Sequence, residues 1–287
     1  MRCKSLVSTV VLCLCLGAGN AAAFQAAPYS DTLMFVDWWV QDKPDYRKTV
    51  LDALKTFTSS VKTGEPGTRI YLLYTPKVPS QPPAGTGQII FVENYQDEQA
   101  FNTHLNNFNA AIRNRFGGLF VPVPNSALDP FIQVTNADRY RSSPTAPPAG
   151  YIRPGAPHRA AITQNVRWWL KPTANRQKVL QDLAKFAAFC EREEPGTLIY
   201  LFSLPEEGQV WPPANDGEIV FMAAYESQAA FDHHVDNWNK LFLDPNKDAF
   251  VTSPDGDYPF IQVLDLEFFD GFVRPEVTTG GGSEEKP

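Results

Sequence analysis

The chain has 287 residues, a formal net charge of −7 at pH 7 and four cysteines. Its acidic balance, without any cluster of Lys and Arg, argues against nucleic-acid binding, which normally requires a basic face. The expected partner is instead a small organic molecule or another protein. The length is sufficient for two domains with adequate cores.

The first 23 residues have the pattern of a signal peptide. Arg2 and Lys4 precede an apolar run from Leu6 to Leu16, and Ala21-Ala22-Ala23 is typical of a cleavage site. The apolar run is too short to span a bilayer comfortably, and no other segment approaches ~18 apolar residues. We therefore expect no membrane span, cleavage after Ala23, and a secreted or periplasmic product.

Residues 30–140 are predicted to form a first domain in which strands and helices alternate. Its helices show apolar residues at steps of three and four, and its strands are rich in Val, Ile, Phe and Trp. The Glu65-Pro66-Gly67-Thr68 element ends the first helix, because Pro cannot continue a helix and Gly permits a left-handed turn. The predicted elements are a strand at 32–40, a helix at 45–62, a hairpin with strands at 70–74 and 88–95 joined by a Pro-rich loop, a helix at 97–114 and a strand at 130–134.

A linker rich in Pro and Gly is predicted at 141–158, followed by a second domain at 159–275 and a disordered tail at 276–287. The second domain repeats the first: the octet that begins at Glu65 returns at Glu194, 129 positions later (194 − 65). A period this long indicates two whole domains rather than a solenoid. Each domain follows the βαββαβ order of the ferredoxin-like fold, an α+β architecture that leaves one sheet face open. We expect the two open faces to pair as a pseudo-dimeric α/β barrel within one chain.

Two histidines are the first candidates for catalysis. His104 and His234 occupy equivalent positions on the helix stripe that faces the sheet, among apolar residues. The alternative is that each is a packed histidine bonded to the backbone. Tyr95 and Tyr225 end the preceding strands, where a hydroxyl could bind a substrate oxygen or simply mark the edge of the core.

Asparagine and tryptophan residues supply the candidates for substrate binding. Asn107 and Asn237 follow the histidines by three residues, on a neighbouring face of the helix, where they either orient a ligand or are ordinary exposed helix residues. Trp39 and Trp168 belong to Trp-Trp pairs whose members point to opposite faces of their strands. Each tryptophan therefore either packs in a core or interface or stacks on a substrate. His233 occurs in one repeat alone and is expected to be exposed. Glu65 and Glu194 are interpreted as helix-end residues.

No metal or cofactor motif is recognisable. The four histidines lack further ligands at usable spacing, and phosphate loops, the Gly-x-Ser-x-Gly motif and paired catalytic carboxylates are missing. Because the other three cysteines lie in the predicted leader, Cys190 cannot form an internal disulfide in the mature chain. Its apolar helix position predicts a buried structural thiol.

Three passages resemble the antibiotic biosynthesis monooxygenase (ABM) superfamily of dimeric α/β barrels, which includes quinol monooxygenases. They are the Lys43-Pro44 start of the first helix, Glu65-Pro66-Gly67-Thr68 with Ile70-Tyr71-Leu72, and the segment 91–101 with His104-Leu105 behind it. The second copy repeats them. The resemblance implies cofactor-independent oxidation of a small aromatic or quinol-type substrate by O2, with a desolvated pocket, a proton acceptor and hydrogen bonds to an oxyanion.

The resemblance also leaves open which repeat carries a site. A haem-degrading branch of the same fold uses Asn, Trp and His, and Asn165 lies where that Asn would be, although Tyr225 stands in place of the Trp. Asn165 and Trp238 favour the second repeat, whereas Glu93, replaced by Ala223, favours the first. The alternative function is a non-catalytic ligand-binding or structural module that kept the barrel and lost the chemistry.

Overall fold

The computed structural model describes residues 32–77, 87–122, 132–138, 150–211, 218–252, 259 and 261–274. The predicted signal peptide (1–23), the tail (276–287) and most of the Pro-rich loop between the hairpin strands of the first repeat lie outside these residues. Among the described residues, no helix has the length and apolar character needed to cross a membrane.

The first repeat has the predicted order of elements. Its long helix α2 buries the stripe of Val50, Leu54, Phe57 and Val61, and Asp97 caps helix α3 by accepting a hydrogen bond from the Ala100 amide. The predicted helix 97–114 is divided by a π-helical turn, η3, which widens the backbone spiral for five residues. The elements are β1 (Thr32–Trp39), α2 (Tyr46–Gly64), β2 (Thr68–Pro76), β3 (Gln88–Tyr95), α3 (Glu98–Phe108), η3 (Asn109–Arg113), α4 (Asn114–Phe116), η4 (Gly117–Leu119) and β4 (Ile132–Asp138).

The second repeat reproduces this pattern, including a π-helical turn, η5, at the equivalent place. Its last strand is longer than the predicted Pro-Phe-Ile-Gln-Val segment. Between the repeats lie β5 (Gly150–Ile152) and α5 (Ala156–Arg159). The elements of the second repeat are β6 (Ile162–Trp169), α6 (Arg176–Glu193), β7 (Thr197–Trp211), β8 (Glu218–Tyr225), α7 (Gln228–Trp238), η5 (Asn239–Leu243), α8 (Asp244–Asn246), η6 (Lys247–Ala249) and β9 (Ile261–Val273).

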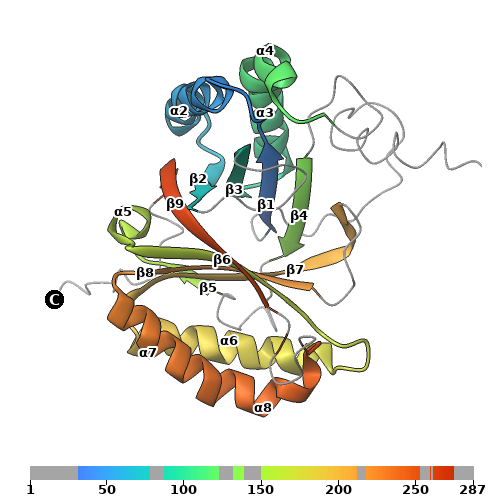
Figure 1. Cartoon of the computed structure of the whole chain (residues 1–287), viewed down its shortest axis with the longest axis vertical. Helices are drawn as coiled ribbons and strands as arrows, with labels where there is room; N and C mark the ends of the chain where they lie inside the picture. The colour runs from blue at the N-terminus through green and yellow to red at the C-terminus, as the bar shows by residue number, and fades with distance from the viewer. Residues whose placement is uncertain are drawn as a thin grey trace, which may run out of the picture.

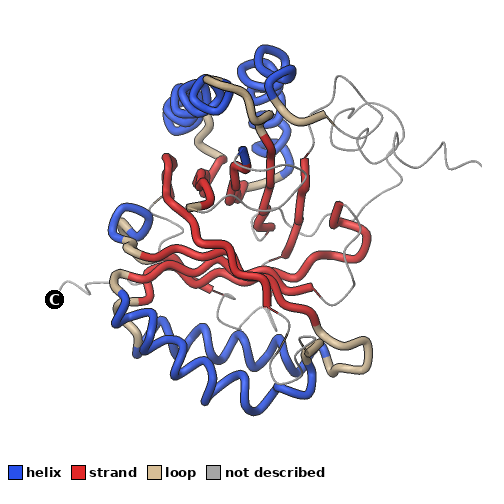
Figure 2. The backbone as a smooth tube through the Cα atoms, viewed as in Figure 1, coloured by secondary structure: helices blue, strands red, loops and turns tan. Residues whose placement is uncertain are grey.

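The strands of both repeats form one closed antiparallel sheet. Their order is β4-β1-β3-β2-β9-β6-β8-β7, β4 also pairs with β7, and β5 lies against β7. The pairs β2–β9 and β4–β7 therefore join the repeats at two places, as the predicted pseudo-dimeric barrel requires. Figure 1 shows α2 and α3 on one side of the strands and α6 and α7 on the other, and Figure 2 shows the strands between these helical layers.

Alternation along the strands divides the apolar side chains into three cores. Trp38 and Trp168 point toward the helices of their own repeats, each in a core between helices and sheet. A third core lies between the two halves of the sheet and contains Phe35, Leu72 and Met222. The barrel interior is thus packed with apolar side chains of both repeats, which explains why neither open face is left exposed.

The segment assigned by sequence to the linker is partly regular structure. Gly150 to Ile152 forms β5 on the edge of β7, and Tyr151 and Ile152 are buried. The short helix α5 follows, with Pro157 in its first turn. Some of the Pro and Gly residues that suggested a linker have a role in this local structure. Pro157 suits the start of a helix, and Gly150 adopts a positive φ of 112°.

Candidate polar cluster at the helix–sheet boundary

The two candidate histidines occupy equivalent buried positions, and each is held by a glutamate of its own repeat. His104 Nδ1 lies 2.7 Å from Glu65 Oε2, and His234 Nδ1 lies 2.7 Å from Glu194 Oε2. The histidines are on α3 and α7, whereas the glutamates end α2 and α6. The cluster therefore ties the two helices of each repeat together.

Each glutamate is the centre of a wider hydrogen-bond network. The amide of Asn107 donates to Glu65 Oε1 at 2.8 Å, and the hydroxyl of Thr68 donates to Oε2 at 3.1 Å. In the second repeat Asn237 and Thr197 donate to Glu194 at 2.8 and 2.9 Å. The interpretation of the glutamates as helix-end residues was incomplete, because they both cap the helices and bind the histidines.

The glutamates are held in the ionised form. Burial alone would raise their pKa. The hydrogen bond and charge of the neighbouring histidine, with the hydrogen bonds from Asn and Thr, outweigh burial. The net effect lowers the pKa of Glu65 below its usual value and lowers the pKa of Glu194 to about 2. The pKa is lowered because three side chains, a His, an Asn and a Thr, make hydrogen bonds to each ionised carboxylate.

Aromatic rings surround both histidines. The ring of His104 lies 5.0 Å from that of Tyr71 and 5.3 Å from that of Tyr95, and Phe57 is 5.5 Å away. His234 has equivalent neighbours in Phe186, Tyr200 and Tyr225. Both histidines are about 95% buried, with exposed fractions of 4% and 5%. The predicted exposure of His233 is confirmed.

The first repeat adds a second buried carboxyl group to its cluster. The Tyr95 hydroxyl donates to Glu93 Oε2 at 2.8 Å, on the side of β3 that faces α3. Burial raises the pKa of Glu93, and the nearby His104 and the Tyr95 hydroxyl only partly oppose it. Ala223 occupies the equivalent position in the second repeat, so this carboxyl–phenol pair occurs in the first repeat alone.

The profile of the family described as Antibiotic biosynthesis monooxygenase matches residues 40–110. The first repeat contains an ABM domain. The matched segment includes Glu65, Glu93, Tyr95, His104 and Asn107, so the whole first-repeat cluster lies within it. No curated protein matches the chain by sequence.

Solved structures share the arrangement of the ABM domain and its second copy. A provisionally assigned monooxygenase from Lactobacillus acidophilus NCFM superposes with a TM-score of 0.60 at 12% identity, covering 85% of this chain and 96% of that one. A similar protein from Fusobacterium nucleatum gives 0.57 at 13% identity, covering 85% and 94%. An anthrone oxidase-like protein gives 0.51 at 10% identity, covering 88% and 99%. At these identities the likeness concerns the fold, and it extends over both repeats.

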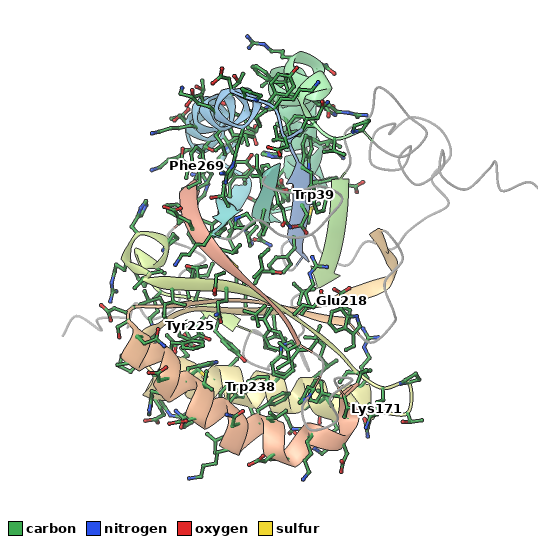
Figure 3. The ribbon with its side chains drawn as sticks, in the orientation of Figure 1. Trp39, Lys171, Glu218, Tyr225, Trp238 and Phe269 are labelled. Atoms are coloured by element: carbon green, nitrogen blue, oxygen red, sulfur yellow. The ribbon has the colours of Figure 1, made fainter. Side chains whose placement is uncertain are left out.

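The remaining candidates do not all join the histidine clusters. Trp168 and Trp238 pack edge to face, 4.3 Å apart, in the core between the second-repeat helices and the sheet. Figure 3 shows Trp238 and Tyr225 in this layer, next to α6 and α7. Trp39 and Asn165 lie on the opposite face of their strands, toward the barrel interior, and Asn165 donates to the Phe221 carbonyl at 3.3 Å. Trp168 and Trp238 therefore belong to the packed core of the second repeat.

One group of three potential metal ligands occurs among the described residues. The ligand atoms of Cys190, Glu194 and His234 lie within 4.8 Å of one another, and all three side chains are buried. Cys190 Sγ approaches the same Nδ1 of His234 that bonds Glu194, so the three do not form a relay through the imidazole. In the ABM domain Val61 replaces the cysteine while the His–Glu distance is unchanged, so the pair does not need a metal to form. Burial raises the pKa of the Cys190 thiol well above its usual range, in line with the predicted structural thiol.

A second polar cluster joins the ABM domain to its copy. Arg167 on β6 lies 3.1 Å from Asp37 on β1 and 3.0 Å from Glu218 on β8, and Gln88 donates to Asp37 at 2.7 Å. Asp37 and Arg167 are equivalent positions in the two repeats, as are Gln88 and Glu218. Because the first repeat has Asp37 where the second has Arg167, the two charges attract when a first repeat pairs with a second repeat. Two identical repeats would instead bring like charges together. The cluster thus favours the pairing of unlike repeats.

An open hollow lies elsewhere, where the start of α2 meets β9. It is lined by Asp45, Arg47, Lys48, Leu51, Asp52 and Phe269. None of the candidate residues lies in this hollow.

Proposed function

We propose that the ABM domain of the first repeat is a monooxygenase that oxidises a small phenolic or quinol-type molecule with O2. The observation that carries this proposal is the buried Glu93 carboxyl, bonded to Tyr95 and close to His104, in the one repeat that the family profile matches. A buried carboxyl with a raised pKa beside a phenol and an imidazole suits proton transfer.

The reaction balances without a further reductant. Glu93 accepts a proton from a phenolic hydroxyl, and the resulting substrate anion gives electrons to O2. With a quinol, one oxygen atom enters the ring and the other leaves as water, which takes up the proton held by Glu93; the ring loses two hydrogens and becomes a hydroxyquinone. With a monohydroxy phenol the same balance gives a quinone and water. The substrate supplies all the electrons, so the proposed chemistry needs no cofactor.

The neighbouring residues support this chemistry in different ways. Burial and the Glu93 charge raise the pKa of Tyr95 well above its usual value, so its hydroxyl remains a hydrogen-bond donor at neutral pH. Once Glu93 has taken up the substrate proton, the Tyr95 hydroxyl can turn its one hydrogen from Glu93 to the developing oxyanion of the substrate. His104 is fixed by Glu65, and Asn107 is fixed by the same carboxylate, which would keep the cluster rigid during the reaction.

One observation favours a non-catalytic module instead. In both repeats the histidine is buried, bonded to a glutamate and enclosed by aromatic rings, so the network can serve purely to fasten the helices to each other. A purely structural role would be the same in both repeats. The Glu93–Tyr95 pair is present in the first-repeat cluster only, and it is therefore the feature that favours catalysis there.

Oxygen uptake distinguishes the two functions. We expect the wild type to consume O2 with at least one member of a panel of quinols and anthrone-type phenols. Glu93→Gln should lower kcat/KM by roughly 100-fold or more, as for the loss of a general base. Tyr225→Phe in the second repeat is the matched control for Tyr95→Phe and should leave the rate unchanged. Failure of the wild type to oxidise any of the panel would support the non-catalytic alternative.

We further propose that the enzyme is exported. The pattern of residues 1–23 supports this, and it predicts a mature chain that begins at Phe24. Mass spectrometry of the protein recovered from the medium or periplasm measures the mature N-terminus directly. An intact N-terminus in the cytoplasmic fraction would contradict export.

A further inference from the structure

A five-residue pattern recurs outside the regions that revealed the duplication. Gly150-Tyr151-Ile152-Arg153-Pro154 precedes the second repeat, and Gly271-Phe272-Val273-Arg274-Pro275 follows it. Tyr151 pairs with Tyr200 on β7, and Phe272 pairs with the equivalent Tyr71 on β2. The two copies therefore lie in equivalent places, each alongside the strand that follows a Glu-Pro-Gly-Thr turn.

The arginine of each copy binds the backbone of that turn. Arg274 Nε donates to the Thr68 carbonyl at 2.7 Å, and its Nη2 donates to the Glu65 carbonyl at 2.9 Å. Arg153 donates to the carbonyls of Thr197 and Glu194 at 3.0 and 3.3 Å. The last carbonyls of a helix lack partners within the helix and carry partial negative charge. A guanidinium satisfies both needs at once.

The rest of the pattern positions the arginine. Arg274 lies 5.1 Å from the centre of the Phe272 ring, and Arg153 lies 5.0 Å from that of Tyr151. Gly271 has a φ of 143°, and a Cβ atom there would approach the Tyr71 carbonyl oxygen to 2.3 Å. Gly150 shows the same 2.3 Å approach to the Tyr200 oxygen. Glycine is needed because the two backbones come this close.

The last strand of each repeat reaches the other repeat. The first part of β9 pairs with β6 of its own repeat, and its end pairs with β2 of the first repeat. In the first repeat β4 pairs with β1 along one edge and with β7 of the second repeat along the other, and β5 pairs with β7 further along that strand. Gly150–Arg153 therefore corresponds to the end of the last strand of the first repeat, separated from β4 by an insertion.

We infer that Arg274 and Arg153 are cross-repeat positioning residues. Each holds the Glu-Pro-Gly-Thr turn of the opposite repeat and thereby orients the glutamate that binds His104 or His234. Each cluster is thus completed by the terminal strand of the other repeat. This inference does not depend on the proposed oxidation, because it concerns the geometry of the Glu–His pair and not its chemistry.

A crossed experiment on the full chain tests the inference. Arg274→Met and Arg153→Met keep the aliphatic stem and remove the donors. In isotope-labelled protein, the imidazole signals of His104 and His234 and the amides of Thr68 and Thr197 report on the two clusters separately, since each amide bonds the carbonyl of its own glutamate at 3.0 Å. Arg192→Met, in the last turn of α6 but exposed, is the matched control and should change neither cluster.

The expected result is reciprocal. Arg274→Met should shift the His104 signal and speed exchange of the Thr68 amide at least about tenfold, with His234 and Thr197 unchanged, and Arg153→Met should do the reverse. Equal changes in both clusters, or none, would overturn the inference. If a methionine variant does not fold, Arg274→Lys and Arg153→Lys, which keep the charge, should give the same crossed pattern with smaller shifts. A pattern that is not crossed in the lysine variants would likewise overturn it. Because no activity is measured, failure here is distinct from failure of the proposed oxidation.

Discussion

Glu65 ends helix α2 and, from that position, binds the imidazole of His104 on α3 at 2.7 Å. The side chain thus joins the end of one helix to the middle of the next, on the side that faces the sheet. Glu194 and His234 repeat the relationship at the same distance. A bond retained in both copies, only one of which has Glu93, is first of all a requirement of the fold.

Removal of Glu65 should therefore be costly for stability. Glu65→Ala leaves His104, Asn107 and Thr68 without their shared acceptor in a buried site, and we expect a loss of roughly 3–5 kcal/mol in the free energy of unfolding. Denaturant unfolding followed by circular dichroism measures it. Glu98→Gln, on the exposed first turn of α3, is the control and should cost less than about 0.5 kcal/mol. A loss for Glu65→Ala as small as that of the control would show that the network contributes little.

Stability should also depend on pH through Glu194. Its pKa is lowered in the folded state from the usual 4.5 to about 2, so its contribution is fully present above pH 4.5 and is lost as the pH falls toward 2. We expect a loss of about 3 kcal/mol over this interval from this residue. Urea midpoints between pH 5 and 2 measure it, and the decline should be shallower in Glu194→Gln. Parallel declines in the two proteins would contradict the assignment to Glu194.

The repeat and its periodicity are sufficient to predict the architecture. Apolar residues at helical and strand spacing locate α2, α6 and the central strands, and the agreement of two copies confirms each element. The pairing of open sheet faces follows because a ferredoxin-like sheet has helices on one face only. These features depend on patterns within each repeat, which sequence records directly.

Contacts between distant segments could not be predicted in the same way. The sequence marks Glu65 as a helix-end residue, but only the packing of α3 against α2 brings His104 to its carboxylate. Similarly, Arg274 lies 206 residues from Thr68, and its pattern was obscured by the Pro-rich composition of the segment around Arg153. The short Gly-aromatic-aliphatic-Arg-Pro repeat was the available signal in the sequence.

The charged cluster between the repeats gives a further prediction. Arg167→Met would leave Asp37 and Glu218 buried and without their counter-charge, and we expect a loss of roughly 3–5 kcal/mol. The triple variant Asp37→Asn/Arg167→Met/Glu218→Gln removes all the charges and should regain most of that loss, as seen for buried ion pairs replaced together. Thermal unfolding of the single and triple variants provides the comparison. A triple variant no more stable than Arg167→Met would show that the charges are not coupled.

Two glycine substitutions should change stability in opposite directions. Gly271→Ala places a Cβ atom 2.3 Å from the Tyr71 carbonyl oxygen at a positive φ, so β9 must move away from β2, and we expect a loss of at least about 2 kcal/mol. Gly64, in the last turn of α2, has open space around its missing Cβ, and Gly64→Ala should stabilise by roughly 0.5–1 kcal/mol through helix propensity. Chemical denaturation of both variants measures whether each change in stability is a loss or a gain.

Gly271 lies three residues before Arg274. Its substitution should therefore also weaken the hydrogen bonds from Arg274 to the Glu65 and Thr68 carbonyls and speed exchange of the Thr68 amide, whereas Gly64→Ala should not. A Gly271→Ala variant with unchanged stability and unchanged Thr68 exchange would contradict the close approach of these two strands.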